Sequence, residues 1–390
     1  MSTAPAPRRW PSACFRATQN AYVHEQAIGR FTVTGLYGNG RRRQRRRSGQ
    51  GGPSHTYAAI DLGSNNCRLL VARPSHEGFR VIDAFSRIVR LGEGVHASGE
   101  LSQGAIERTI EALHVCAGKM HRRGVDRARC IATEACRRAS NGSAFLSRVK
   151  DETGIALEII APDEEVRLAL AGCLPLIEPW ARHVGVLDIG GGSTEISWLA
   201  IDEDGEHELE AWVSLPCGVV SLAETHGGDV IDDAAYRAMV GHVEDLLAPF
   251  EQRHRFRDRL AGGTAQIIGT SGTVTTLAGV HLNLPHYDRR RVDGTTIGYD
   301  DLDAVIGRLR TMALAERASV PCIGQDRADL VVAGAAILDA VRALWPVGRL
   351  SVADRGLREG VLLGLMRQDL GAGHQGTAGV GAARVAAADL

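Results

Sequence analysis

Two stretches of the chain share the same order of apolar and polar positions. Residues 57–60 are apolar and lead to Asp61, and the largely apolar residues 184–187 lead to Asp188. In each stretch an aliphatic residue and a glycine follow the aspartate, and a second apolar run begins a few residues later. Short apolar runs bounded by glycine are typical of buried strands. The pattern therefore predicts two strand–turn–strand hairpins, whose aspartates lie 127 positions apart.

The residues after each hairpin repeat one order of elements. Apolar positions such as Ile106, Ile110 and Leu113 recur with a helical period, whereas shorter apolar runs indicate buried strands. In the first half the predicted elements are a strand at 80–85, a helix at 102–123, strands at 130–132 and 155–160, and a helix opened by Pro162. In the second half they are strands at 211–215, 266–268 and 350–353 and helices at 232–250, 327–344 and 356–368. We predict an α/β duplication with a cleft between its halves.

The repeat divides the chain into four segments. Pro175, Pro179 and Trp180 interrupt the pattern between the halves, so we place a boundary near 176–183. The prediction is an arginine-rich, disordered arm at 1–56, a first domain at 57–178, a second domain at 179–369 and a flexible tail at 370–390.

Charge is distributed unevenly along the chain. Residues 1–54 hold ten arginines and one acid, so the rest of the chain has 35 basic and 45 acidic residues. The mildly acidic body argues against a nucleic-acid-binding surface over the main fold. The arm, with its run of arginines at 41–47, either stays solvated by self-repulsion or contacts a polyanion such as RNA or polyphosphate.

Cysteine usage and hydropathy indicate a cytoplasmic protein. The eight cysteines form no Cys-x-x-Cys pair and no zinc-like cluster, which is typical of buried thiols in a reducing compartment. The apolar stretch at 330–345 contains Asp339 and Arg342 and is too short to cross a bilayer, so we expect no membrane contact.

The turns of the two hairpins are candidate phosphate-binding loops. Glycine lets backbone N–H groups approach an anion closely because no Cβ intervenes. Either turn alone also fits a plain hairpin, but the pair in one context favours a phosphate ligand. A third loop at 269–273 precedes a helix, where it either binds an anion or is a capped helix start with Thr273 as N-cap. The candidate phosphate-binding residues are Gly63, Ser64, Asn65, Gly190, Gly191, Gly192, Ser193 and Gly272.

Carboxylates and arginines near these loops supply candidate chemistry. Asp61 and Asp188 are natural Mg²⁺ positions, because Mg²⁺ takes one or two carboxylates together with waters and phosphates. Glu195 either points back to the second loop or is an exposed strand residue. The acids at 163–165 either serve the helix dipole or include a base for a water nucleophile. Arg137 and Arg138 are either phosphate ligands or ordinary surface arginines.

Six stretches, in order along the chain, resemble the motifs of the exopolyphosphatase/guanosine pentaphosphate phosphatase (Ppx/GppA) family. That family belongs to the superfamily of actin, sugar kinases and heat-shock ATPases. The resemblance implies two similar ribonuclease H-like (actin-like ATPase) domains around an interdomain phosphate-binding cleft, in the short two-domain form of the family. The six stretches are residues 59–66, 132–137, 163–167, 187–195, 269–273 and 354–360.

The resemblance also implies roles for individual residues. Glu165 matches the catalytic glutamate that activates water, and Arg137 matches the arginine that binds the terminal phosphate. Asp188 matches the magnesium-linked aspartate, with Glu195 close to it and Asp61 assisting, and the hairpin turns match the loops around the phosphate chain. The implied protein is a Mg²⁺-dependent, homodimeric exopolyphosphatase, with guanosine pentaphosphate (pppGpp) as the alternative substrate.

Two positions depart from the family pattern. Family members often carry an aromatic or aliphatic residue in place of Cys67 and a serine or other small residue in place of Glu134. An acid at 134 either weakens phosphate binding or pairs with Arg137 or Arg138. Two alternatives of other classes remain, namely a kinase of the same superfamily and a non-catalytic sensor of ppGpp or polyphosphate. The glutamate motif at 163–167 argues against a kinase, and a pure sensor would need no base.

Overall fold

The computed structural model describes residues 24–26, 55–76, 78–227 and 231–375, with side-chain surroundings described up to residue 369. These residues form two compact units. Residues 55–176 and 354–375 make up what we call the first unit, and residues 24–26 and 177–353 make up the second unit. Most of the predicted disordered arm and residues 376–390 of the predicted tail lie outside the described residues.

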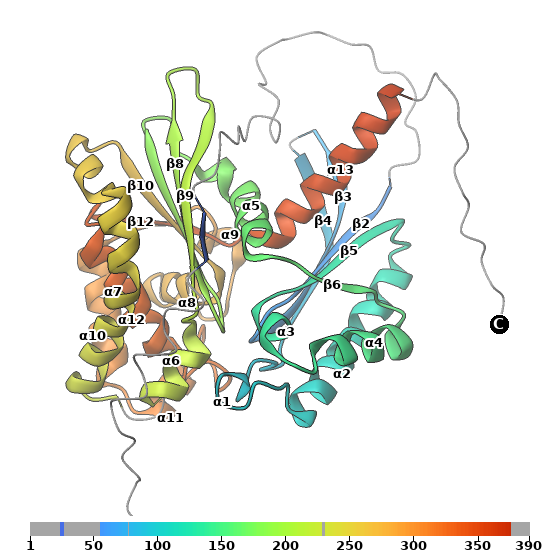
Figure 1. The fold of residues 1–390 in the computed structure, drawn as a ribbon, viewed down its shortest axis with the longest axis horizontal. Coiled ribbons are helices and arrows are strands. Elements are labelled where there is room, and N and C mark those ends of the chain that lie inside the picture. Colours follow the sequence, from blue (N-terminus) through green and yellow to red (C-terminus); the bar gives the residue numbers. More distant parts are fainter. Residues whose placement is uncertain (1–23, 27–54, 77, 228–230, 376–390) are drawn as a thin grey trace, which may run out of the picture. The chain divides into compact units, whose positions relative to one another are not determined.

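The first unit contains a five-stranded sheet, shown in Figure 1. Strands β4, β3 and β2 form an antiparallel meander, and β2, β5 and β6 run parallel, in the order β4-β3-β2-β5-β6. The strands are β2 (Tyr57–Leu62), β3 (Asn66–Ser75), β4 (Gly78–Ile88), β5 (Arg127–Ala132) and β6 (Leu157–Ile159). The helices are α1 (Val95–Ser98), α2 (Gln103–Arg122), α3 (Glu134–Arg138), α4 (Gly142–Thr153), α5 (Pro162–Cys173) and α13 (Leu357–Gln375), and a 3₁₀ turn covers Leu174–Leu176.

The second unit repeats this topology in a seven-stranded sheet of order β1-β9-β8-β7-β10-β12-β11. Strands β9, β8 and β7 are antiparallel, and β7, β10 and β12 are parallel. The strands are β1 (His24–Gln26), β7 (His183–Ile189), β8 (Thr194–Ile201), β9 (His207–Leu215), β10 (Ala265–Thr270), β11 (Thr296–Gly298) and β12 (Arg349–Ala353). The duplication of an α/β unit is therefore confirmed.

Helices of the second unit pack mainly against one face of its sheet. They are α6 (Val219–His226), α7 (Asp233–His254), α8 (Ser271–His281), α9 (Arg289–Val292), α10 (Tyr299–Thr311), α11 (Leu314–Ser319) and α12 (Val331–Leu344), with a 3₁₀ turn at Phe256–Gly262. The core on that face includes Leu187 and Ile189 of β7 together with side chains of α7, α8 and α12. Strands alternate their side chains between faces, so Asp188 faces the opposite side.

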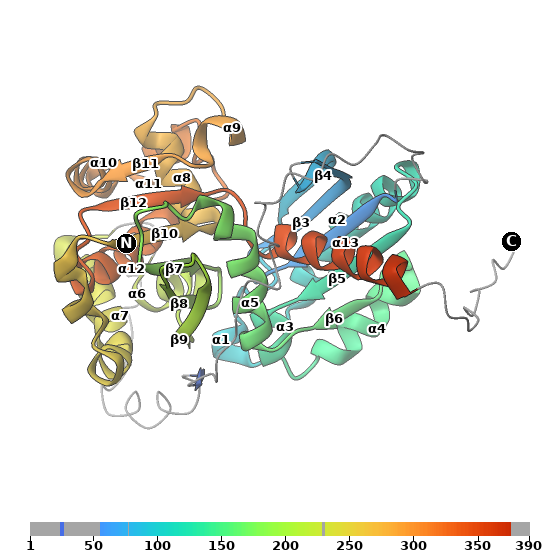
Figure 2. The same cartoon turned by 90° about the horizontal axis from the view of Figure 1, so that it is seen from above.

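The sheet of the first unit is covered on both faces. Ala58, Ile60 and Leu62 of β2 belong to the core formed with α2 and α4. Tyr57 and Ala59 belong to a second core with Leu362 and other residues of α13, which lies along this face of the sheet in Figure 2. The alternation places Asp61 on the same face as α13.

The packing of α13 corrects the predicted domain assignment. Residues up to 369 were predicted to belong to the second domain, but α13 packs on β2 and on α5 and belongs to the first unit. The helix also continues to Gln375, where a flexible tail from residue 370 was predicted. Neither point follows from local periodicity, because an apolar helix face does not specify which sheet it covers.

Helices α5 and α13 approach each other closely through glycines. A Cβ on Gly360 would lie inside 3.0 Å of the carbonyl oxygen of Leu168, and a Cβ on Gly172 would lie equally close to the carbonyl oxygen of Gly356. Real Cβ atoms essentially never show such separations. The two backbones can therefore touch only because both positions lack a side chain.

One strand forms within the predicted disordered arm. His24–Gln26 pairs antiparallel with β9, where Glu25 lies opposite Val213. Strand β11 and helix α10 were also not predicted from the sequence. Short edge strands such as β1 and β11 carry too few residues to show a period of two.

Candidate functional site

The candidate residues of the first unit gather where its parallel strands end. Leu62 of β2 lies opposite Ala132 of β5, which in turn lies opposite Ile159 of β6. The loop 63–65, helix α3 and helix α5 follow these three strands directly. Ligands of open α/β sheets bind at such carboxyl edges. The sheet topology thus explains why loop, arginine and glutamate come from stretches far apart in sequence.

Two loops with the same internal geometry close the two hairpins. The amide of Gly63 donates to the carbonyl of Asn66 at 2.9 Å, and the amide of Gly190 donates to the carbonyl of Ser193 at 2.9 Å. The side chains of Ser64, Asn65 and Ser193 are buried within their loops. The hairpins and their glycine turns are therefore present where the apolar pattern predicted them.

Each loop is supported by a second glycine segment of its own unit. In the first unit, the amide of Gly92 donates to the carbonyl of Ser64, and a Cβ on Gly92 would lie 2.8 Å from the Ser64 Cβ. In the second unit, the amides of Val219 and Val220 donate to Gly190 and Gly191, and a Cβ on Gly218 would lie 2.5 Å from the Gly191 carbonyl. Sequence reasoning missed Gly92 and Gly218, since only the close approach of two loops makes them necessary.

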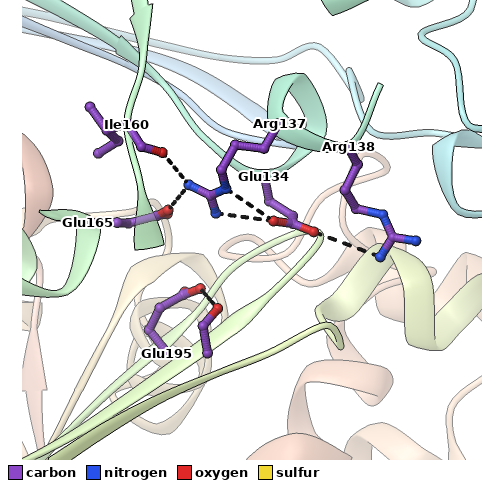
Figure 3. Close-up of polar contacts among 7 residues, drawn as sticks. Glu134, Arg137, Arg138, Ile160, Glu165 and Glu195 are labelled. Carbon is purple, nitrogen blue, oxygen red and sulfur yellow. Dashed lines mark hydrogen bonds and ion pairs between the residues drawn. The ribbon is translucent and has the colours of Figure 1, made fainter. Parts of the chain in front are cut away.

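Arg137 and Glu165 form an ion pair in the first unit, shown in Figure 3. The Nη1 atom of Arg137 donates to Glu165 Oε2 at 2.7 Å and to the carbonyl of Ile160 at 2.8 Å. The exposed fractions of the two side chains are 14% and 12%. The structure thus brings together the predicted base and the predicted phosphate-binding arginine, which come from α5 and α3.

The three acids of the α5 first turn have different partners. Asp163 pairs with Arg167 one turn later at 3.2 Å, and Glu164 accepts from Arg129 of β5 at 2.6 Å. Both of these carboxylates are more exposed than that of Glu165. Of the three, Glu165 is the acid that contacts Arg137, which the sequence alone left open.

Glu134 occupies the other edge of the Arg137 guanidinium. Its Oε2 accepts from Arg137 Nε at 3.3 Å and from Arg137 Nη2 at 3.1 Å, and its Oε1 lies 3.8 Å from Arg138 Nη1. Figure 3 shows the carboxylate between the two arginines. Glu134 therefore pairs with Arg137 and Arg138, which is one of the outcomes considered for an acid at this position.

Asp61 has arginine neighbours in the first unit. It lies opposite Arg68 in the β2–β3 ladder, and the guanidinium of Arg358 at the start of α13 is also close. Burial raises the pKa of Asp61, an effect that Arg68 and Arg358 oppose. Burial also lowers the pKa of Arg358, whereas the neighbouring Glu359 raises it. Asp61 thus belongs to a cluster of mixed charge.

Asp188 has a carboxylate opposite it in the second unit. Asp188 and Glu195 are direct partners in the antiparallel β7–β8 ladder, so their Cβ atoms lie about 4.5–5.5 Å apart on one face of the sheet. Ser214 of β9 donates to Glu195 Oε1 at 2.8 Å, and Thr270 of β10 lies opposite Asp188 on the other side. Glu195 is buried, at 5% exposure, so the interpretation as an exposed strand residue is wrong.

The donor set of this pair fits a magnesium ion. Mg²⁺ uses one or two carboxylates and completes its shell with waters and substrate phosphates. Two carboxylates on one face match that preference, whereas Asp61 has arginines beside it. In the part of the chain that the structure describes, no three His, Cys, Asp or Glu side chains form a metal-binding group.

The helix that follows the third loop begins earlier in the sequence than predicted. Thr270 is the N-cap residue and α8 begins at Ser271, so Thr273 lies inside the helix and is not its N-cap. Ser271 has a φ of +75°, which is unusual for a residue other than glycine. Strain of this kind concentrates at functional sites. Sequence reasoning named Gly272 and missed Ser271, because nothing in a serine signals a left-handed backbone.

The seven cysteines among the described residues are buried and form no disulfide with one another, and burial raises the pKa of Cys130, Cys136 and Cys217 to about 12. Over the same residues, every helix is too short or too polar to cross a bilayer.

Comparisons with known proteins find relatives that are similar to most of the chain. The model of the Ppx/GppA phosphatase family matches residues 70–369. The chain is 30% identical over 329 residues to exopolyphosphatase 2 of Mycobacterium tuberculosis, an alignment that spans 79% of this chain and 98% of that protein. It is 28% identical to a guanosine-5'-triphosphate,3'-diphosphate pyrophosphatase of Aeromonas hydrophila, over 80% of this chain and 60% of that protein.

Solved structures show the same fold. The crystal structure of the Aquifex aeolicus member of the Ppx/GppA family superposes with a TM-score of 0.66 at 31% identity, covering 81% of this chain and 99% of that one. An exopolyphosphatase from Cytophaga hutchinsonii gives a TM-score of 0.73 at 23% identity, over 80% of this chain and 98% of that one. At this identity the match shows only that the two chains share a fold.

Proposed function

Because the chain belongs to the Ppx/GppA phosphatase family, we propose that it hydrolyses the terminal phosphate of inorganic polyphosphate. The observation that carries the proposal is the contact of Glu165 with Arg137 in the first unit, at 2.7 Å. A carboxylate beside an arginine at the carboxyl edge of a sheet can hold a water molecule next to a bound phosphate.

In this proposal Glu165 orients and deprotonates the attacking water. The Arg137 guanidinium orients the Glu165 carboxylate and offers N–H donors to the terminal phosphate. Backbone N–H groups of the loop at 63–65 in the first unit and of the loop at 190–193 in the second unit are further proposed phosphate ligands, because their glycines leave the backbone accessible. Such groups stabilise the charge that develops on the phosphoryl oxygens.

We place the magnesium ion on Asp188 and Glu195. When bound there, Mg²⁺ would neutralise charge on the phosphate oxygens. The opposed carboxylates of β7 and β8 support this choice, and the hydrogen bond from Ser214 orients Glu195. We leave Asp61 out of the metal site, since the positive charges of Arg68 and Arg358 nearby disfavour a cation there.

The alternative substrate is pppGpp, as the similarity to the Aeromonas hydrophila pyrophosphatase suggests. We favour polyphosphate because the alignment spans 98% of the Mycobacterium tuberculosis exopolyphosphatase but 60% of the Aeromonas protein. Both substrates end in a phosphoanhydride, so the same groups would act on either.

Phosphate release from polyphosphate and from pppGpp, measured with and without Mg²⁺, tests the proposal. We expect Mg²⁺-dependent release, faster from polyphosphate than from pppGpp. If phosphate is released from neither substrate although polyphosphate binds tightly, the protein is a sensor and not an enzyme. Formation of a phosphorylated acceptor from ATP would instead indicate a kinase.

A further inference from the structure

Arg137 presents two edges, and each is in contact with a carboxylate of the same unit. The Nη1 edge contacts Glu165 and the carbonyl of Ile160, and the Nε–Nη2 edge contacts Glu134 Oε2. The Nε–Nη2 edge of an arginine has the fork geometry that binds phosphate with two parallel hydrogen bonds. Glu134 therefore lies where the phosphate that Arg137 is proposed to bind would dock.

Glu134 and a phosphate compete for the same donors. Two anions on one edge of a guanidinium repel each other, and the repulsion is large where the site is largely buried. Glu134 is 15% exposed and Arg137 is 14% exposed. Bound phosphate consequently requires the Glu134 carboxylate to turn away from Arg137.

Arg138 provides a place for the displaced carboxylate. Its Nη1 already lies 3.8 Å from Glu134 Oε1, and 30% of its side chain is exposed. Glu134 opens the short helix α3, so a change of its side-chain rotamer disturbs no helical hydrogen bond of its own. The carboxylate can thus move from one arginine to the next within the same short segment.

We propose that Glu134 is a built-in competitor of phosphate, which occupies the phosphate-binding edge of Arg137 and is displaced by substrate. The inference rests on the proposed function and names a property of the same site. Orthophosphate, held at one position, competes poorly with Glu134, whereas a chain bound at several positions displaces it. Glu134 therefore weakens product inhibition at the expense of substrate affinity.

The test compares the full-length protein with its Glu134→Ser and Glu134→Gln variants at fixed free Mg²⁺. The measurements are the KM and kcat for tripolyphosphate and the inhibition constant of orthophosphate. We expect the serine variant to lower both the KM and the inhibition constant about tenfold, because a competing charge leaves the site. The glutamine variant, which keeps an acceptor but no charge, should lower both about threefold.

Glu152→Ser is the matched control. Glu152 is a glutamate of the same unit that also pairs with an arginine, Arg148, but it lies on the exposed side of α4. This variant should leave the KM, kcat and inhibition constant unchanged.

The inference is overturned if both Glu134 variants leave the two constants unchanged or raise them. Raised constants would mean that Glu134 holds Arg137 in place for substrate. Calorimetric binding of tripolyphosphate to the same three variants needs no hydrolysis. A wild-type protein that binds but does not hydrolyse would contradict the proposed function, while the ratio of dissociation constants between wild type and Glu134→Ser would still decide the role of Glu134.

Discussion

Replacing Gly360 by alanine is expected to force helices α5 and α13 apart. The new Cβ would lie inside 3.0 Å of the carbonyl oxygen of Leu168, whereas ordinary van der Waals contact begins at 3.4 Å. The obstacle is backbone, so no side chain can turn away, and the helices themselves have to shift. Leu168 follows Glu165 by three residues, which transmits the shift to the proposed base.

The energetic cost has two opposing parts. Forcing a methyl group into a closed contact costs about 1–3 kcal/mol, and a backbone obstacle belongs at the upper end of that range. Replacing a helical glycine by alanine returns about 1 kcal/mol through helix propensity. The net expectation is a loss of about 1–2 kcal/mol in the free energy of unfolding of the first unit.

Gly364→Ala is the matched control on the same helix. A Cβ on Gly364 meets nothing within 4 Å, so this variant should gain about 0.5–1 kcal/mol from helix propensity alone. Urea unfolding followed by circular dichroism gives both free energies, compared within the same transition. The kcat for polyphosphate should fall in Gly360→Ala and stay constant in Gly364→Ala. Equal stability of the two variants would refute the close packing of α5 on α13.

Three further predictions concern charge and reactivity. Hydrogen bonds from Lys119 and Arg123 lower the pKa of Asp83 to about 2, below its value of about 3.9 in an unfolded chain. Asp83 therefore stabilises the fold fully above about pH 4. The advantage of wild type over Asp83→Asn, about 1 kcal/mol after solvent screening, should decrease below that pH and be lost as the pH falls through about 2 in denaturant titrations. Asp188→Asn should raise the Mg²⁺ concentration for half-maximal rate at least about tenfold. If that concentration is unchanged, the ion binds elsewhere. The pKa of Cys136, raised to about 12 by burial, should make it inert to thiol reagents at pH 8 until urea unfolds the chain, and rapid labelling of native protein would contradict its burial.

Much of the fold was predictable because its signals are local. The apolar runs before Asp61 and Asp188 and the helical period at 102–123 each depend on neighbours in sequence. They correspond to β2, β7 and α2 in the structure, and the repeat of strand order follows from them. The assignment of α13 failed, since which sheet a helix covers depends on contacts between distant segments.

The candidate site was predictable in part for the same reason. Glycine turns and the acids at 163–165 are visible as residue types, but their partners are not. These contacts depend on the parallel order of β2, β5 and β6, which brings Glu165 to Arg137 and Glu164 to Arg129. The strained backbone of Ser271 and the supporting glycines at 92 and 218 have no signature outside the folded chain.

The most direct test of the account replaces two adjacent glutamates one at a time. Glu165→Gln removes the proposed base beside Arg137. Glu164→Gln removes its neighbour on the same turn of α5, which pairs with Arg129 of β5. Phosphate release from polyphosphate at saturating Mg²⁺ should show a kcat lower by about 10²–10⁴-fold in Glu165→Gln, because general-base assistance is lost. Glu164→Gln should stay close to wild type. Equal rates for wild type and Glu165→Gln would contradict the assignment of Glu165 as the base.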